Sequence, residues 1–222
     1  MATGTRGIKH FQTPERLKAL GDGVFAIALT LLIIDVVAVA KEVEEGVSLQ
    51  QHLTDHWATG AAYLVGFLTI FVCWMNHQTV FEHVAKVDSP LVWVSGLQLA
   101  LVSAVPLPTA LLADHFTGDD SDTVFFLYGV TFFLMAFSFW ILSRTVRSRS
   151  LLADDGDRAA LGKLVHTYFI AVIWTVASLA VLQVSLYAAG VMWALMFLVF
   201  AFPVEFAYQA HLRMTSKIAR VD

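Results

Sequence analysis

The sequence contains one cysteine, five prolines and few charged residues along its 222 positions. The lone cysteine, Cys73, excludes a disulfide bond within the chain. Charged residues make up 14% of the sequence and the formal net charge is −4, which does not favour a nucleic-acid partner. Hydrophobic residues, by contrast, make up 58% and the mean hydropathy is +0.69. A soluble domain needs more polar surface to cover its core, so the composition indicates an integral membrane protein.

The apolar residues are concentrated in six blocks, and a helix that crosses a bilayer needs about 20 mostly apolar residues. In lipid a helix satisfies its own backbone polar groups, whereas a β-barrel would need short segments of alternating polarity, which these blocks lack. We therefore predict an all-α integral membrane protein with six transmembrane helices. The blocks are Leu17–Ala40, Trp57–Phe81, Pro90–Ala113, Thr123–Ser143, Leu164–Tyr187 and Ala189–Tyr208.

Basic residues are distributed unevenly between the segments that connect the blocks. The segments expected on one side carry nearly all of them, whereas the other side carries Lys41 alone. Under the positive-inside rule both termini are therefore cytoplasmic. We expect residues 1–16 to form a cytoplasmic N-terminal segment, residues 17–208 the membrane domain and residues 209–222 a cytoplasmic tail. The first block is too long for a signal peptide and is expected to stay in the mature protein.

The first block contains a carboxylate, Asp22, between Gly21 and Gly23 near its start. A carboxylate at the membrane edge is costly unless it is paired or solvated. The positive end of the helix dipole would stabilise Asp22 there, which is one interpretation. The other is a polar contact with the second block, where Trp74 and His77 lie three residues apart at the same expected depth and so share a face.

The third block contains two prolines, Pro106 and Pro108, with Ser103 before them and Thr109 after them. Proline lacks a backbone N–H and clashes with the preceding turn, so this pair should kink or break the helix. Packing geometry is the interpretation that we favour for this motif.

The first block resembles the signature of the transmembrane protein 175 potassium channel family, which is found in bacteria and in animal lysosomes. That signature consists of Arg, three further residues, Phe-Ser-Asp and an apolar stretch that closes in Thr-Leu-Leu. The matching residues here are Arg16, Asp22, Thr30, Leu31 and Leu32. Two positions depart from it: Leu20 replaces the usual Phe, and Gly21 replaces Ser and removes a hydroxyl from the expected polar network.

Two further blocks carry shorter resemblances to the same family, in the same order along the chain. Trp74 and His77 are similar to its Trp-x-x-His motif. The third block is similar to its Ser-x-x-Pro-x-Pro-Thr stretch, with Ser103, Pro106, Pro108 and Thr109. The resemblance covers three of the six blocks, and the last three blocks add little to it.

The resemblance implies a moderately selective potassium channel of four identical chains in the bacterial inner membrane, with the first helix lining a central pore. It implies that Ile27, Leu31 and Ile34 form apolar constricting rings, with the Thr30 hydroxyl beside them. Positions i, i+4 and i+7 share one helical stripe, although an apolar helix does not reveal its pore face by periodicity. Below the pore, it implies a polar cluster that holds the first two helices in register, made of Arg16, Asp22, Trp74 and His77.

Other classes of protein leave weaker signs in the sequence. A proton-coupled transporter or a proton pathway could use Asp22 and His77, but no inverted repeat accompanies them. No Gly-x-Ser-x-Gly or His-Glu-x-x-His motif is present, so we expect no catalysis. His52 and His56 could bind a metal if that segment were helical, but no third ligand is evident and we predict no metal site. The expected partners are potassium ions, lipid and further copies of the chain, with no cofactor.

Overall fold

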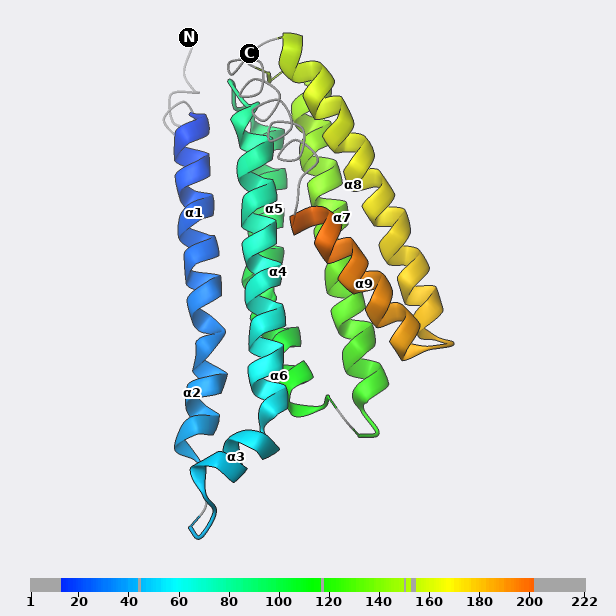
Figure 1. Ribbon diagram of the computed structural model, residues 1–222. Coiled ribbons are helices and arrows are strands. Elements are labelled where there is room, and N and C mark those ends of the chain that lie inside the picture. The colour runs from blue at the N-terminus through cyan, green and yellow to red at the C-terminus, as the bar shows by residue number, and fades with distance from the viewer. Residues whose placement is uncertain (1–12, 44, 117, 150, 153–154, 202–222) are drawn as a thin grey trace, which may run out of the picture.

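The computed structural model describes residues 13–43, 45–116, 118–149, 151–152 and 155–201, without the side chains of residues 155–157. These residues form an all-helical bundle, as predicted (Figure 1). The helices are α1 (Pro14–Leu31), α2 (Ile33–Lys41), α3 (Leu49–Asp55), α4 (Trp57–Glu82), α5 (Ser89–Ala104), α6 (Pro106–Asp114), α7 (Ser121–Ser148), α8 (Asp155–Leu182) and α9 (Leu186–Ala201).

Five helical segments of the described residues are long and apolar enough to cross a membrane. They correspond to the first five predicted blocks and are Pro14–Lys41, Trp57–Glu82, Ser89–Asp114, Ser121–Ser148 and Arg158–Leu182. At 1.5 Å per residue, the shortest of them is about 37 Å long, which exceeds the hydrocarbon core of a bilayer. The sixth apolar helix, α9, has 16 residues. The end of its predicted block, residues 202–208, lies outside the described residues, as do residues 1–12 and the predicted tail at residues 209–222.

The first membrane segment is interrupted between α1 and α2 at Leu32. Leu32 keeps helical dihedral angles, with φ −61° and ψ −27°, so the chain continues along nearly the same axis. Two residues earlier, the Thr30 hydroxyl donates to the carbonyl of Ile27 at 2.9 Å. Hydroxyl bonds of this kind compete with the backbone ladder and can bend helices.

The third membrane segment is broken between α5 and α6 at Val105, directly before the two prolines. Pro106 and Pro108 have no N–H, so two carbonyls of the preceding turn lose their helical donors. The chain compensates in part, because the Val105 N–H bonds the Val102 carbonyl at 3.1 Å. The Thr109 N–H and hydroxyl both donate to the Val105 carbonyl.

Both interruptions lie against Gly66 of α4. A β-carbon at Gly66 would lie 2.8 Å from the Thr109 methyl and 3.2 Å from a Leu32 methyl. Any larger side chain would therefore push at both interrupted helices. Glycine is required here for close approach, although its φ is ordinary for a helix.

The helices pack in two groups joined by α4 and α5 (Figure 1). The first helix, α1, packs on α4 and α5 at the edge of the bundle, whereas α7 packs on α5 and α8. The short α9 lies across α8 and α4. The buried core along these contacts contains large side chains such as Phe25, Ile70, Leu142 and Tyr168. As a result, one long side of α1 has no partner within the described part of the chain.

At the predicted cytoplasmic end, the α4–α5 loop is joined to the segment after α7. Val84 and Leu152 form an isolated β-bridge, and the N–H groups of Ala85 and Lys86 both donate to the Leu151 carbonyl. Beside this bridge, the Arg149 guanidinium donates to the Asp88 carboxylate. Asp88 also caps α5, because it accepts the Leu91 N–H at 3.0 Å.

The loop after α2 folds into the short helix α3, which hydropathy did not reveal. His52, which is buried, lies 2.8 Å through Nε2 from the carbonyl of Val39, and His56 bonds the His52 carbonyl at 2.9 Å. The two rings are in contact, with their centroids 4.4 Å apart and their planes tilted by 35°. These contacts tie the end of α2 to α3. No group of three or more metal-binding side chains occurs among the described residues.

Candidate functional site: an exposed apolar stripe and a polar node on the first helix

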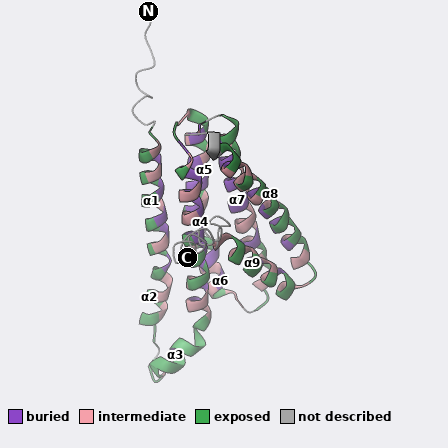
Figure 2. Ribbon diagram, turned by 45° about the horizontal axis from the view of Figure 1, so that its top comes forward, coloured by how far each residue is buried: buried purple, intermediate pink, exposed green. Residues whose placement is uncertain are grey.

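The most exposed apolar surface of the first membrane segment is a stripe along α1 and α2. Ile27 is 61% exposed, Leu31 42% and Ile34 57%, although all three are large aliphatic side chains. The opposite face of α1 is buried against α4 and α5 through residues such as Phe25 and Ala28. Exposed positions accordingly recur along both helices in Figure 2. The structure thus places the three predicted constricting residues together on the side of α1 that faces away from its own chain.

Thr30 lies on the exposed side of α1 beside this stripe. Its hydroxyl proton is directed at the Ile27 carbonyl, because Oγ1 donates there at 2.9 Å. A hydroxyl oxygen that donates in this way keeps its two lone pairs as acceptors. Thr30 therefore presents an oxygen acceptor on an otherwise apolar surface.

A polar node joins α1 to α4 one turn before the stripe begins. Trp74 donates its indole Nε1–H to Oδ1 of Asp22 at 2.9 Å. Gln78, one turn further along α4, donates its amide Nε2–H to the same oxygen. The contact between Asp22 and Trp74 was predicted from the sequence, but the participation of Gln78 was not. The available signal was the spacing of four residues from Trp74, which places Gln78 on the same face.

His77 is fully buried and has a different partner from Asp22. Its Nδ1 lies 2.9 Å from Oε1 of Gln98 on α5, and an amide oxygen only accepts, so Nδ1 carries the proton. Nε2 has no hydrogen-bond partner among the described residues. It faces Gly21, and the ring packs against Phe25 and Phe81. Gln98 was not foreseen, because no periodicity marks the buried face of α5.

Arg16, the fourth member of the predicted polar cluster, lies exposed in the first turn of α1. Its backbone N–H bonds the Thr13 carbonyl at 3.1 Å. Arg16 and Asp22 are six residues apart on this helix, which is about 1.7 turns. At the node itself, the Asp22 carboxylate accepts hydrogen bonds from Trp74 and Gln78.

The residues of the third-helix motif lie around the break at Val105. Ser103 is exposed and donates its hydroxyl to the Leu99 carbonyl at 2.9 Å. Pro106 opens α6, Pro108 is buried, and buried Thr109 lies 3.4 Å from the Tyr128 hydroxyl. Their contacts position α6 against α4 and α7. This is the packing that the sequence favoured for them.

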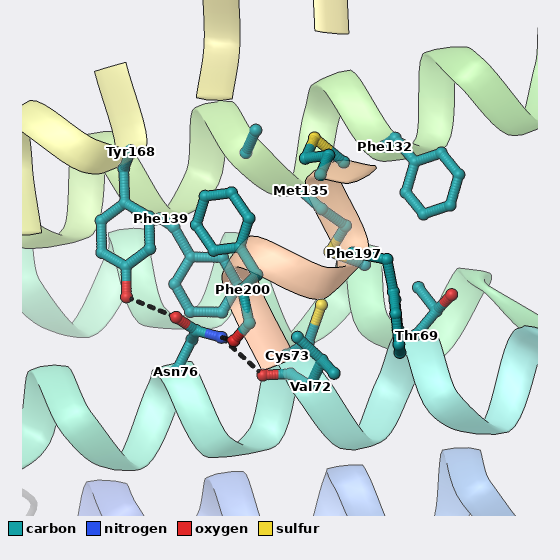
Figure 3. Close-up of a pocket in the computed structure, with 12 residues that line it drawn as sticks. Thr69, Val72, Cys73, Asn76, Phe132, Met135, Phe139, Tyr168, Phe197 and Phe200 are labelled. Atoms are coloured by element: carbon teal, nitrogen blue, oxygen red, sulfur yellow. Dashed lines mark hydrogen bonds between the residues drawn. The ribbon is translucent and has the colours of Figure 1, made fainter. Parts of the chain in front are cut away.

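A second polar network, absent from the sequence predictions, closes a small apolar cavity between α4, α7, α8 and α9 (Figure 3). Tyr168 donates its hydroxyl to Asn76 Oδ1 at 2.9 Å, and the Asn76 amide donates to the carbonyls of Val72 and Phe200. The cavity measures about 60 Å³ and is bordered by Cys73. With every polar atom of Asn76 bonded, this network fixes α8 and α9 to α4.

Two comparisons with known sequences bear on this geometry. Residues 16–106 match the family described as Endosomal/lysosomal potassium channel TMEM175. A protein of Chamaesiphon minutus named as a potassium channel is 34% identical over 154 residues, which cover 69% of this chain and 76% of that protein. The chain belongs to the TMEM175 family. It is a multi-pass membrane protein of that family, and the matched segment includes α1, the polar node and the break at Val105.

Other TMEM175 relatives match over smaller shares of their length. A Streptomyces collinus protein named as a potassium channel is 42% identical over 135 residues, which are 59% of this chain and 65% of that protein. The human relative, named endosomal/lysosomal proton channel TMEM175, is 36% identical over 99 residues. Those residues cover 42% of this chain but 20% of the human protein.

Solved structures of the TMEM175 family share the fold. The crystal structure of a Chamaesiphon minutus homologue of the lysosomal potassium-selective channel TMEM175 superposes with a TM-score of 0.75. That match has 28% sequence identity and covers 85% of this chain and 96% of the other. A second potassium channel structure, a threonine-to-alanine variant bound to a nanobody fusion, has a TM-score of 0.57 at 16% identity. It covers 91% of this chain and 93% of the other, and it supports the fold alone.

Proposed function

We propose that this TMEM175 chain forms a passive, moderately potassium-selective cation channel in the bacterial inner membrane. In this proposal each chain spans the membrane six times with both termini in the cytoplasm, and four copies surround a central pore lined by α1 and α2. Two bacterial relatives that are named as potassium channels support the transported ion. The crystal structure of a related potassium-selective channel also supports it.

The observation that carries the proposal is the uncovered apolar stripe of the first membrane segment. In its most apolar stretch 17% of residues are buried within the chain, compared with 22% to 39% in the other four spanning segments. The stripe itself holds Ile27, Leu31 and Ile34, with the oxygen of Thr30 beside them. Four such stripes around a symmetry axis would cover one another, and closed cyclic assemblies are the usual symmetric solution.

Apolar rings select ions through the cost of dehydration. An ion that passes a narrow ring of isoleucine or leucine side chains must lose part of its water shell, and a dry ring can also gate the pore. Potassium holds its water less tightly than sodium, so the ring favours potassium. The chain has no Thr-Val-Gly-Tyr-Gly segment to replace the lost water with a full cage of carbonyls, so selectivity should be moderate.

Flux in proteoliposomes tests the proposal directly. The purified full-length chain, reconstituted in liposomes with a potassium gradient, should carry a current that is linear in voltage and needs no counter-ion gradient. With potassium on one side and sodium on the other, its reversal potential should be displaced from zero toward the equilibrium potential of potassium. Flux that saturates and depends on a second ion would identify a transporter and overturn the channel proposal.

Proton permeation is the second candidate, because the mammalian relatives are named as proton channels. A relay through Asp22 and His77 would require these groups to exchange a proton. In the structure, however, Asp22 bonds Trp74 and Gln78, whereas His77 bonds Gln98. The same liposomes loaded with a pH-sensitive dye measure this activity alongside potassium flux.

A further inference from the structure

Asp22 receives two hydrogen bonds on one oxygen from two consecutive turns of α4. Trp74 Nε1 and Gln78 Nε2 both donate to Oδ1, and their α-carbons are about 6 Å apart along the α4 axis. Two donors at different heights on α4 restrict the depth and the rotation of α1, in addition to the packing of its buried face on α4 and α5.

Gln78 makes this bond at a cost to its other amide atom. Its Oε1 is buried and has no hydrogen-bond partner among the described residues. Turning the amide over would place Oε1 against the carboxylate, which cannot donate. Asp22 therefore holds the amide in one orientation. The missing hydrogen bond of Oε1 costs less than the loss of the bond to the carboxylate would.

The exposed stripe begins only five residues after Asp22. Asp22 and Ile27 belong to the same uninterrupted helix and are separated along its axis by about 7.5 Å. A rotation of α1 at Asp22 is therefore transmitted to Ile27, because the backbone ladder between them is intact. The contact at Asp22 therefore acts together with the buried face of Phe25 and Ala28 to set which side of α1 points away from the chain.

We propose that Gln78 is a positioning residue of the conduction path, which acts through Asp22 to hold the Ile27 stripe toward the pore axis. This inference rests on the proposed channel function. The other charged or histidine side chains within about two turns of Asp22 on α1 and of Gln78 on α4 are Glu15, Arg16 and Lys18, and His77, Glu82 and His83. Helix α5 carries no charged residue between Ser89 and Ala104.

Gln78→Glu is the sharpest test, because it changes one donor into an acceptor with almost no change of shape. At about pH 7.5 two carboxylates would face each other, and we expect potassium flux in liposomes to fall roughly tenfold. At about pH 5 on both sides, a proton shared between the two carboxylates would restore the hydrogen bond. Flux should then return to within about twofold of wild type at that pH.

The double variant Asp22→Asn with Gln78→Glu reverses the bond. The introduced amide donates to the introduced carboxylate, and its oxygen still accepts from Trp74. Flux should recover to within about twofold of wild type at about pH 7.5, with no need for acid. Gln183→Glu, an exposed site at the end of α8, adds the same charge elsewhere and should follow the wild-type pH profile.

The outcomes separate the two proposals. A wild-type chain that carries no potassium flux overturns the channel function before any variant is compared. If wild type conducts, a Gln78→Glu variant that matches Gln183→Glu at both pH values overturns the role of Gln78. A loss that neither acid nor the reversed pair repairs also overturns it, since simple damage to packing would behave in this way. If Gln78→Glu cannot be purified, the reversed pair alone decides.

Discussion

Gly21 of α1 lies so close to the imidazole of His77 that a β-carbon at position 21 would be 2.7 Å from Nε2. The neighbouring Gly23 has open space around the same position. Helix α1 therefore lies close against His77 of α4 at Gly21, where the TMEM175 signature has a serine. The close approach accounts for a glycine in the middle of a helix, where it would otherwise lower stability.

Gly21→Ala should lower the stability of the protein by about 1–3 kcal/mol, because the added methyl must displace the buried ring of His77. Gly21→Ser should cost less than Gly21→Ala, since a hydroxyl can donate to the unpartnered Nε2. Gly23→Ala is the matched control and should be neutral or stabilising by up to about 1 kcal/mol. Thermal unfolding in detergent, followed by tryptophan fluorescence, checks the order. Equal midpoints for Gly21→Ala and Gly23→Ala would contradict the contact.

Ile27→Asn should reduce the preference for potassium over sodium. An amide in the ring would hold water in the constriction, so the ions would lose less of their shell as they pass. The reversal potential with potassium on one side and sodium on the other should move toward zero. Ile173→Asn, an isoleucine of similar exposure on α8, is the control and should leave the reversal potential unchanged. An unshifted potential in Ile27→Asn would remove Ile27 as the selective constriction.

The ion pair between Asp88 and Arg149 should make part of the stability depend on pH. Burial raises the pKa of Asp88, but the hydrogen bond from Arg149, the Leu91 N–H and the nearby positive charge together hold its pKa below the ordinary value of 3.8. A depressed carboxyl pKa stabilises the fold above pH 3.8, and this contribution disappears as the pH falls through the lower, folded-state pKa.

Asp88→Asn tests that dependence, because asparagine can still cap α5 but cannot form the ion pair. The Arg149 side chain is 48% exposed, so the loss at neutral pH should be at most about 1 kcal/mol and should shrink in high salt. Unfolding midpoints of wild type and variant, measured at several pH values, should converge below pH 3.8. A gap that stays constant down to lower pH would show that the charge contributes nothing.

The spanning helices and the proline break could be predicted from the sequence because each has a strong local cause. Long apolar blocks predict five of the spanning helices, and Pro106 with Pro108 predicts the end of α5. The break at Leu32 could not be predicted, since no proline or glycine marks it. Helix α3 was missed because polar seven-residue helices leave no hydropathy signal.

The polar node was only partly predictable. Counting residues places Asp22 and Trp74 at one depth, and the structure joins them by a hydrogen bond. The same counting grouped His77 with them. Successive residues of a helix differ by about 100°, so His77 and Gln78 diverge around α4, one toward α5 and the other toward Asp22. In helices that are apolar all round, the sequence does not show which direction leads to which neighbour.

Gly66 is a shared contact point for the two interrupted membrane segments. Leu32 and Thr109 both approach this glycine, so the first and the third membrane segments meet α4 at one backbone position. A side chain at position 66 would therefore separate α4 from the first and the third membrane segments at the same time.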